Sequence, residues 1–290
     1  MPRTNLPTDL LRTLTTVIDL GGYTRAAEAL GRTQPAISLQ IGRLEALLEC
    51  KLIEQSGRSV KLTDSGEALA QFARQILQIN DEAVSHFTAP AANGGLRIGL
   101  PNDYAVSYLQ KVLADFVSEH PDVTLEIHCN LSRNLVEALN RDELDVVVGL
   151  SASGDNPFLV RIWEDTPVWA AAKGFVPRDD AVIPLLVHPE GCEYRNRMIA
   201  ALAQNQRRWR VAFTSLGIGE LQQAVNSGLG VTALTQKTLQ EGMNVLSEKQ
   251  GFPKLGNIRI GLFYKQARLT DAGVMVVNLL SQRLDEASDS

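Results

Sequence analysis

Small polar side chains gather at the start of one segment with an apolar stripe, "RTQPAISLQIGRLEALL" (residues 32–48). Its apolar residues recur at helical spacing, at Ile37, Ile41, Leu44 and Leu48. Thr33 is placed to cap this helix, and Pro35 falls in the first turn, where its missing N–H costs little. Gln34 and Ser38 fall outside the stripe. Exposed amide and hydroxyl groups near a helix N-terminus are suited to hydrogen bonds with base edges in a duplex.

The surrounding residues predict the elements that would position this helix. Residues 6–20 have helical spacing and stop at Gly21 and Gly22, and a second helix, capped by Thr24, ends at Gly31. Beyond the third helix, "KLIEQ" and "SVKLT" predict a hairpin around Ser56-Gly57-Arg58. Helices followed by a hairpin predict a winged helix-turn-helix domain over residues 1–65, mostly α-helical. Its third helix would enter the major groove.

Charge neither demands nor excludes this interpretation. The chain carries a net charge of −5, whereas residues 1–65 carry +1, from eight Lys and Arg against seven Asp and Glu. A strongly basic patch is the usual electrostatic mark of a nucleic-acid binder. The placement of the residues must therefore carry the prediction.

One long helix is predicted from Asp64 to about Ala89, and its apolar residues form a heptad seam. They step by 3, 4, 3 and 4 along Leu69, Phe72, Ile76, Ile79 and Ala83, with Phe87 after them. We expect this seam to pair with the same seam of a second copy. The alternative is that it packs on the body of its own chain. Small and turn residues at 88–95 predict a hinge.

The remainder alternates strands and helices, which predicts an open α/β sheet, and its length suits two lobes. Predicted strands are 96–100, 123–128, 144–150, "AVIPLLV", "RWRVAFT", "GVTAL" and "IRIGLFY". Predicted helices are 104–119, 132–141, 194–205, 217–228 and 272–286. The apolar run "LDVVVGL" is typical of a parallel strand covered on both faces.

Motifs for catalysis, cofactors and metals are absent from the sequence. There is no phosphate-binding loop, no dinucleotide-binding glycine pattern and no nucleophile elbow. Cys50, Cys129 and Cys192 fit neither a disulfide framework nor a metal site. No run of about 18 apolar residues predicts a membrane span, and no signal peptide is evident. We expect a cytoplasmic protein that is not an enzyme, with no cofactor and no membrane partner.

The stretch "GYTRAAEALGRTQPAISLQIGRLEALLECKLIEQSGRSVKLTDSGEAL" resembles the DNA-binding domain of the LysR-type transcriptional regulators. The similarity continues in order through "LRIGLPNDYA", "EHPDVTLEI", "LDVVVG" and "AVNSGLGVTAL". The segments "GRTQ", "LPNDYA" and "PEGCEYRNR" resemble the branch of the motility repressor LrhA.

The resemblance implies a two-lobe regulatory domain like a periplasmic binding protein at 94–290, after a dimerising linker helix at 66–90. Lobe I would comprise about 94–163 and 266–290, and lobe II about 164–265. The partners would be double-stranded operator DNA, an unknown small-molecule effector and further copies of the chain. Those copies would form a homodimer through the linker helix and a homotetramer that bends DNA.

Carried over by resemblance, the base-reading residues are Gln34, Pro35, Ser38 and Leu39. The family often has Arg at position 39, and Leu39 cannot bond guanine, so the operator should differ. Arg58 at the wing tip would enter the minor groove. Phosphate contacts would come from Thr24, Arg25, Thr33 and Arg43. Capping by the two threonines, and a solvated turn at Arg58, are the alternatives.

The effector would lie at the C-terminal ends of strands, where free backbone N–H groups favour a polar or anionic ligand. The candidate residues are Pro101, Asn102, Asp103, Tyr104, Ser132, Asn134, Ser151, Cys192, Thr214 and Ser215. Asp103 argues against a simple anion site. For Asp103 and Ser132 helix capping is the alternative, and a redox role is a further alternative for Cys192. At the level of function, the alternative to a regulator is an enzyme or binding protein whose N-terminal domain only oligomerises.

Overall fold

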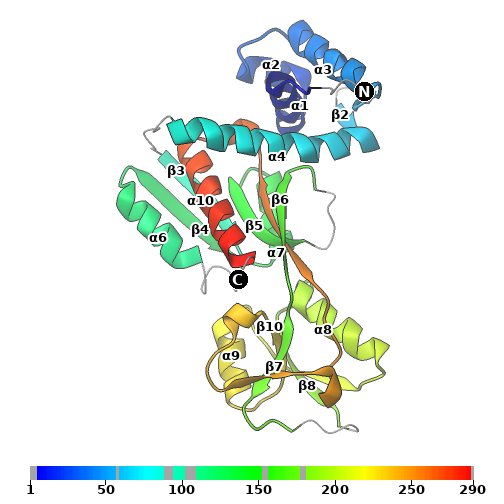
Figure 1. Cartoon of the computed structure of the whole chain (residues 1–290), viewed down its shortest axis with the longest axis vertical. Helices are drawn as coiled ribbons and strands as arrows, with labels where there is room; N and C mark the ends of the chain where they lie inside the picture. The colour runs from blue at the N-terminus through cyan, green and yellow to red at the C-terminus, as the bar shows by residue number, and fades with distance from the viewer. Residues whose placement is uncertain are drawn as a thin grey trace.

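The computed structural model describes residues 5–56, 59–87, 94–101, 109–151, 156–176 and 181–288. Figure 1 shows three bodies stacked along the long axis, with the N-terminal domain at the top. Helix α4 (Asp64–Phe87) lies across the molecule between that domain and the next body, lobe I. Lobe II forms the opposite end.

The N-terminal domain has the predicted three helices and a hairpin. These elements are α1 (Thr8–Leu20), α2 (Tyr23–Ala29), α3 (Gln34–Leu48), β1 (Ile53–Ser56) and β2 (Ser59–Leu62). Gly21 adopts the left-handed conformation, with φ of 65°, that ends α1. One detail of the prediction is wrong. Because α2 begins two residues earlier than a cap at Thr24 would allow, Gly22 and not Thr24 is its N-cap residue.

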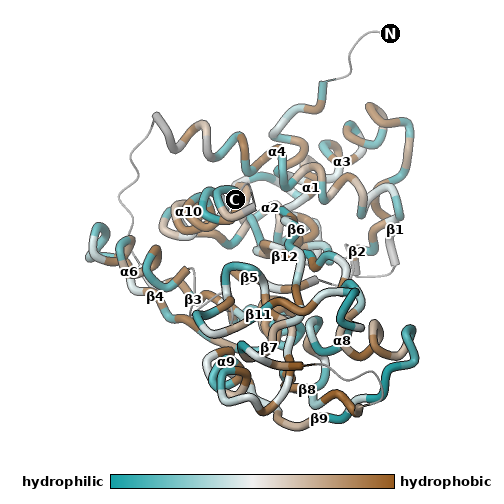
Figure 2. The backbone as a smooth tube through the Cα atoms, turned by 60° about the horizontal axis from the view of Figure 1, so that its bottom comes forward, coloured by the Kyte–Doolittle hydropathy of each residue, from teal (hydrophilic) through white to brown (hydrophobic). Residues whose placement is uncertain are grey.

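Helix α4 buries one side and exposes another. Leu69, Ala73 and Leu77 pack into the core of the N-terminal domain. Phe72 and Ile79 stay 62% and 67% exposed. Figure 2 shows apolar and polar residues alternating along α4. The predicted seam is therefore split, because Leu69 is buried in its own domain while Phe72, Ile76, Ile79 and Ala83 are exposed. The side chain of Phe87 lies outside the described residues.

Lobe I is built on a five-stranded mixed sheet in the order β4-β3-β5-β12-β6. Its strands are β3 (Gly94–Leu100), β4 (Val123–Cys129), β5 (Val146–Ser151), β6 (Leu159–Asp165) and β12 (Ile258–Tyr264). Strands β3, β4 and β5 are parallel, as predicted, whereas β12 is antiparallel to β5 and β6.

Helices cover both faces of the lobe I sheet, which buries β5, β12 and most of β3, whereas the edge strand β4 stays largely exposed. On one face lie α6 (Gln110–Glu119) and α10 (Asp271–Ser288), and on the other lies α7 (Ser132–Asn140). The predicted boundary of lobe II at residue 265 needs correction. Because β12 pairs within the lobe I sheet, the chain has returned to lobe I by residue 258.

Lobe II holds a three-stranded sheet, β10-β7-β11, and a parallel pair, β8-β9. Its strands are β7 (Val168–Ala172), β8 (Ile183–Val187), β9 (Trp209–Thr214), β10 (Thr232–Leu234) and β11 (Met243–Leu246). Its α-helices are α8 (Glu193–Gln204) and α9 (Ile218–Asn226). Short 3₁₀ turns are η2 (Gln236–Thr238), η3 (Glu248–Gln250) and, back in lobe I, η4 (Gln266–Arg268). Strands β6, β7 and β11 were not predicted.

Two segments of chain connect the lobes (Figure 1). A hydrogen bond from the hydroxyl of Thr166 to the amide oxygen of Asn257, at 3.0 Å, ties the two segments together. Among the helices that the structure describes, none is long and apolar enough to cross a membrane.

Candidate DNA-reading helix and ligand cleft

Helix α3 presents an exposed face that is mostly polar. Its buried residues, Ile37, Ile41 and Leu44, fix one side against the domain core. Every predicted contact residue from Thr33 to Arg43 is exposed, and Leu39 is 75% exposed. The exposed members are Thr33, Gln34, Pro35, Ser38, Leu39 and Arg43. Thr33 is the N-cap residue, but its side chain makes no capping hydrogen bond. Its hydroxyl therefore remains a candidate for a phosphate contact.

Polar contacts hold α3 in place behind that face. The hydroxyl of the buried Thr13 donates to Gln40 Oε1 at 2.9 Å. Glu45 accepts from the backbone N–H of Leu52 at 3.0 Å and pairs with Lys51 at 2.6 Å. Burial raises the pKa of Glu45, but these donors outweigh it, so the pKa lies below its ordinary value. The carboxylate therefore fastens α3 to the start of the hairpin.

The remaining predicted DNA contacts lie outside α3. Thr24 and Arg25 are exposed on α2, and Arg25 Nη2 donates to the carbonyl of Gly21 at 3.2 Å. This bond keeps the guanidinium near the turn between α1 and α2. Arg58 lies outside the described residues.

A cleft of about 410 Å³ opens between the two lobes. Residues around the N-termini of α7 and α8 face it from opposite sides: Leu131, Ser132 and Arg133 from lobe I, and Cys192, Glu193 and Tyr194 from lobe II. A methyl group on Gly191 would lie 2.9 Å from Nη1 of Arg133. The guanidinium from lobe I therefore lies directly against the backbone of lobe II.

Three of the predicted effector residues line this cleft: Pro101, Ser132 and Cys192. Ser132 also accepts a hydrogen bond from the N–H of Leu150 at 2.8 Å, which ties α7 to β5. Cys192 is buried and joins the apolar core of lobe II. Asn102, Asp103 and Tyr104 lie outside the described residues, as does the side chain of Ser151.

The other predicted effector residues lie beside the cleft. Asn134 donates to Asn130 Oδ1 at 3.0 Å, within the turn that precedes α7. Thr214 ends β9 and is exposed, while the Ser215 hydroxyl accepts from the N–H of Gly217 at 3.1 Å. Two of these side chains are held by local turns and Thr214 is exposed at its strand end, so the three lie outside the cleft lining. Their part in effector binding stays a prediction.

Sequence reasoning missed several lining residues, among them Arg133, Asn156, His188 and Phe263. His188 Nδ1 lies 3.1 Å from the carbonyl of Ser215 and must donate, because a carbonyl only accepts. The signal for Arg133 was available, since it follows Ser132 in the first turn of α7. Asn156 and Phe263 come from chain segments that only the tertiary fold brings to the cleft.

The N-terminal domain is a winged helix-turn-helix with an exposed third helix, and a long helix joins it to a two-lobe domain that holds a cleft. This arrangement is typical of a DNA-binding regulator with an effector-binding domain. Comparisons with known proteins give the family. Residues 8–67 match the bacterial regulatory helix-turn-helix protein, lysR family, and residues 90–284 match the LysR substrate binding domain. The chain belongs to the LysR family of DNA-binding transcriptional regulators, which are not enzymes.

Similar proteins span nearly the full length. DgdR of Burkholderia cepacia, an HTH-type transcriptional regulator, is 31% identical over 91% of this chain and 90% of its own. PecT of Dickeya dadantii is 30% identical over 89% of this chain and 81% of its own. The solved structure of CrgA from Neisseria meningitidis superposes with a TM-score of 0.56 at 19% identity, covering 96% of this chain and 99% of that one. The last similarity concerns the fold alone.

Proposed function

We propose that the α3 face formed by Gln34, Pro35, Ser38 and Leu39 reads base edges of a specific operator in the major groove. The observation that carries the proposal is the exposure of these side chains on one face of a helix whose opposite face is locked in the core. The Gln34 amide suits adenine, and Pro35 suits a thymine methyl. Thr24, Arg25, Thr33, Arg43 and Arg58 would contact phosphates or the minor groove and set the register.

Footprinting of the DNA upstream of the protein's own gene, at a stated salt concentration, tests this proposal. We expect two separated protected patches that weaken strongly in Gln34→Ala, because one bidentate base contact is worth about 1–3 kcal/mol. The matched control is Gln223→Ala, an exposed glutamine on α9 of lobe II, away from both the reading face and α4. Equal footprints for wild type and Gln34→Ala would contradict the assignment. Salt-sensitive coverage without patches would contradict specific reading altogether.

We also propose that the chain forms a homodimer through α4 and, by family resemblance, a homotetramer on DNA. The exposed seam residues Phe72, Ile76, Ile79 and Ala83, spaced by four, three and four, support the pairing of two helices. A solvated stripe of this length on a long helix costs free energy that a second copy would recover.

The cleft is proposed to bind a small molecule that modulates operator binding. Its volume falls in the range of ligand pockets, and its lining combines apolar side chains with Arg133, Asn156 and Asn196. A ligand with an anionic or polar group suits Arg133, which makes no ion pair that the described residues record.

Thermal unfolding against a panel of small carboxylates and phosphates tests the cleft. A ligand should raise the melting temperature of wild type and of the control Arg210→Ala, but not of Arg133→Ala. An equal shift in all three proteins would place the ligand elsewhere. The finer assignments, to the LrhA branch and to the cytoplasm, remain predictions that rest on short sequence segments and on composition.

A further inference from the structure

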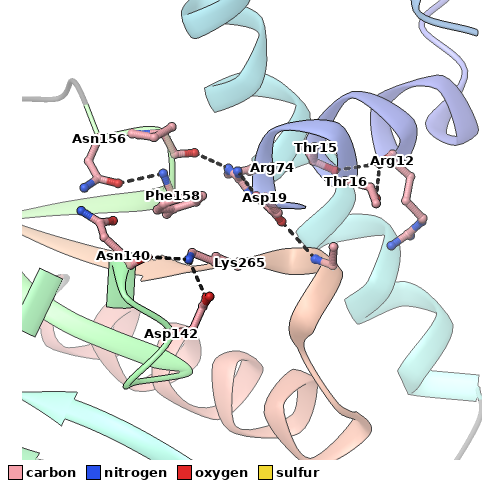
Figure 3. Close-up of polar contacts among 12 residues, drawn as sticks. Arg12, Thr15, Thr16, Asp19, Arg74, Asn140, Asp142, Asn156, Phe158 and Lys265 are labelled. Carbon is pink, nitrogen blue, oxygen red and sulfur yellow. Dashed lines mark hydrogen bonds and ion pairs between the residues drawn. The ribbon is translucent and has the colours of Figure 1, made fainter. Parts of the chain in front are cut away.

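A buried ion pair joins the DNA-binding domain, α4 and lobe I at one point (Figure 3). Arg74 of α4 pairs with Asp19 of α1, with Nη2 2.5 Å from Oδ1, and both side chains are fully buried. Arg74 Nε also donates to the carbonyl of Pro157 at 2.6 Å. Asp19 Oδ2 accepts the N–H of Ala267 at 3.0 Å. We call these four residues the junction.

One segment leads from the junction to the ligand cleft through residues 156–158. Asn156 lines the cleft, and its side-chain oxygen accepts the N–H of Phe158 at 2.8 Å. The carbonyl of the next residue, Pro157, accepts the hydrogen bond from Arg74 Nε. The Phe158 ring lies 5.5 Å from the Arg74 guanidinium and 4.9 Å from the Lys265 ammonium. A displacement of Asn156 would therefore move the adjacent Pro157, whose carbonyl is hydrogen-bonded to Arg74.

A second segment leads to the junction from the other side. Phe263 in β12 lines the cleft and is otherwise buried in lobe I. Four residues later, the N–H of Ala267 bonds Asp19. Between them, Lys265 donates to the carbonyl of Asn140 at 3.0 Å and to Asp142 at 2.6 Å. Both ends of the buried pair are thus held by segments that begin at the cleft.

We propose that the junction couples the cleft to the DNA-binding domain directly, by a lateral contact as well as through α4. A buried charge pair tolerates displacement poorly, because a lost hydrogen bond in a dry site leaves an uncompensated polar group. A molecule that pulls Asn156 or moves Phe263 would change the hydrogen bonds that hold α1 and α4 on lobe I. The orientation of α3 relative to lobe I would follow.

The use of this coupling in regulation rests on the proposed function of the cleft, but the coupling is measured without DNA or ligand. The experiment is hydrogen–deuterium exchange on the full-length chain. Asn156→Ala should speed exchange about fivefold to tenfold at the C-terminal turn of α1 and at Ala267, the change that one net hydrogen bond gives. Helix α8 of lobe II should be unaffected.

Asn196→Ala is the matched control, because Asn196 also lines the cleft but lies in α8, away from the junction. It should leave exchange in α1 unchanged. Unchanged exchange in α1 for Asn156→Ala would overturn the proposal. A rise in α1 in both variants would overturn it as well, because the response would then be general destabilisation.

A second background isolates the ion pair. The double variant D19N/R74M keeps an acceptor for the N–H of Ala267 and replaces the charges by neutral groups of similar size, a change that buried pairs often tolerate. In this background Asn156→Ala should add little to α1 exchange. If it adds the same increment as in the wild-type chain, the ion pair is not the route and the proposal fails. If the exchange experiments show the coupling but the wild-type chain does not bind a specific operator, the proposed function is wrong and the coupling still holds.

Discussion

Replacing Ile79 by Ala should weaken self-association and leave the fold intact. Ile79 is 67% exposed in the single chain, so about two thirds of its side-chain surface can still be buried in a dimer interface. Full burial of such a side chain contributes roughly 1.5–3 kcal/mol, which leaves about 1–2 kcal/mol per copy. A two-fold interface counts each substitution twice, giving about 2–4 kcal/mol per dimer. The dimer Kd should rise about 30-fold to 1000-fold.

Sedimentation velocity over a concentration series measures this change. Alanine has a higher helix propensity than isoleucine, so the substitution does not weaken α4 itself. Ile162→Ala, an exposed isoleucine in β6 of lobe I, is the matched control and should leave the dimer Kd nearly unchanged. The reasoning is refuted if Ile79→Ala associates as tightly as wild type, or if the two variants weaken the dimer equally.

Three further predictions concern the N-terminal domain. Gly66→Ala should lower the melting temperature strongly, because its methyl group would lie 2.0 Å from the carbonyl oxygen of Leu52, whereas Gly42→Ala, with open space around it, should be neutral or slightly stabilising. Since the pKa of Glu45 is lowered in the folded state, its stabilisation is present above its ordinary pKa and lost as pH falls through the folded pKa. Glu45→Gln should therefore lower stability at pH 7 and flatten its decline below about pH 4, as measured by urea unfolding at each pH. Leu39→Arg should shift binding-site selection from a random library towards guanine, by about 1–3 kcal/mol at one position, and an unchanged selected site would count against the α3 assignment.

Periodic apolar spacing made most of the fold predictable. The N-terminal helices and α4 each have a strongly patterned buried side, and the parallel strands β3 and β5 are largely apolar runs buried on both faces. Strand β7 lacked such a signal because three of its five residues are alanines, which are poor strand formers, and β11 lacked it because its two central residues are exposed.

The candidate sites divide in the same way. The exposed face of α3 was predictable, because it is what the buried helical stripe leaves uncovered, and base reading by that face stays a prediction. The cleft was predictable only in part, and the junction was not predicted. In the sequence, Asp19 and Arg74 are ordinary charges on amphipathic helices, and only the packing of the N-terminal domain, α4 and lobe I against one another removes both from water.

Because the N-terminal domain carries little net charge, the proposed DNA interface on α3 should depend on the proposed dimer interface on α4. With a net charge of only +1 over residues 1–65, a single domain neutralises few phosphates and should bind DNA weakly. In the proposed dimer, two domains joined through α4 would bind the second half-site at a high effective concentration, which would multiply the affinity without any new base contact. Ile79→Ala should therefore lower the apparent affinity for operator DNA although Ile79 lies outside the reading face. At protein concentrations above its raised dimer Kd, that loss should disappear, whereas the loss caused by Gln34→Ala should persist.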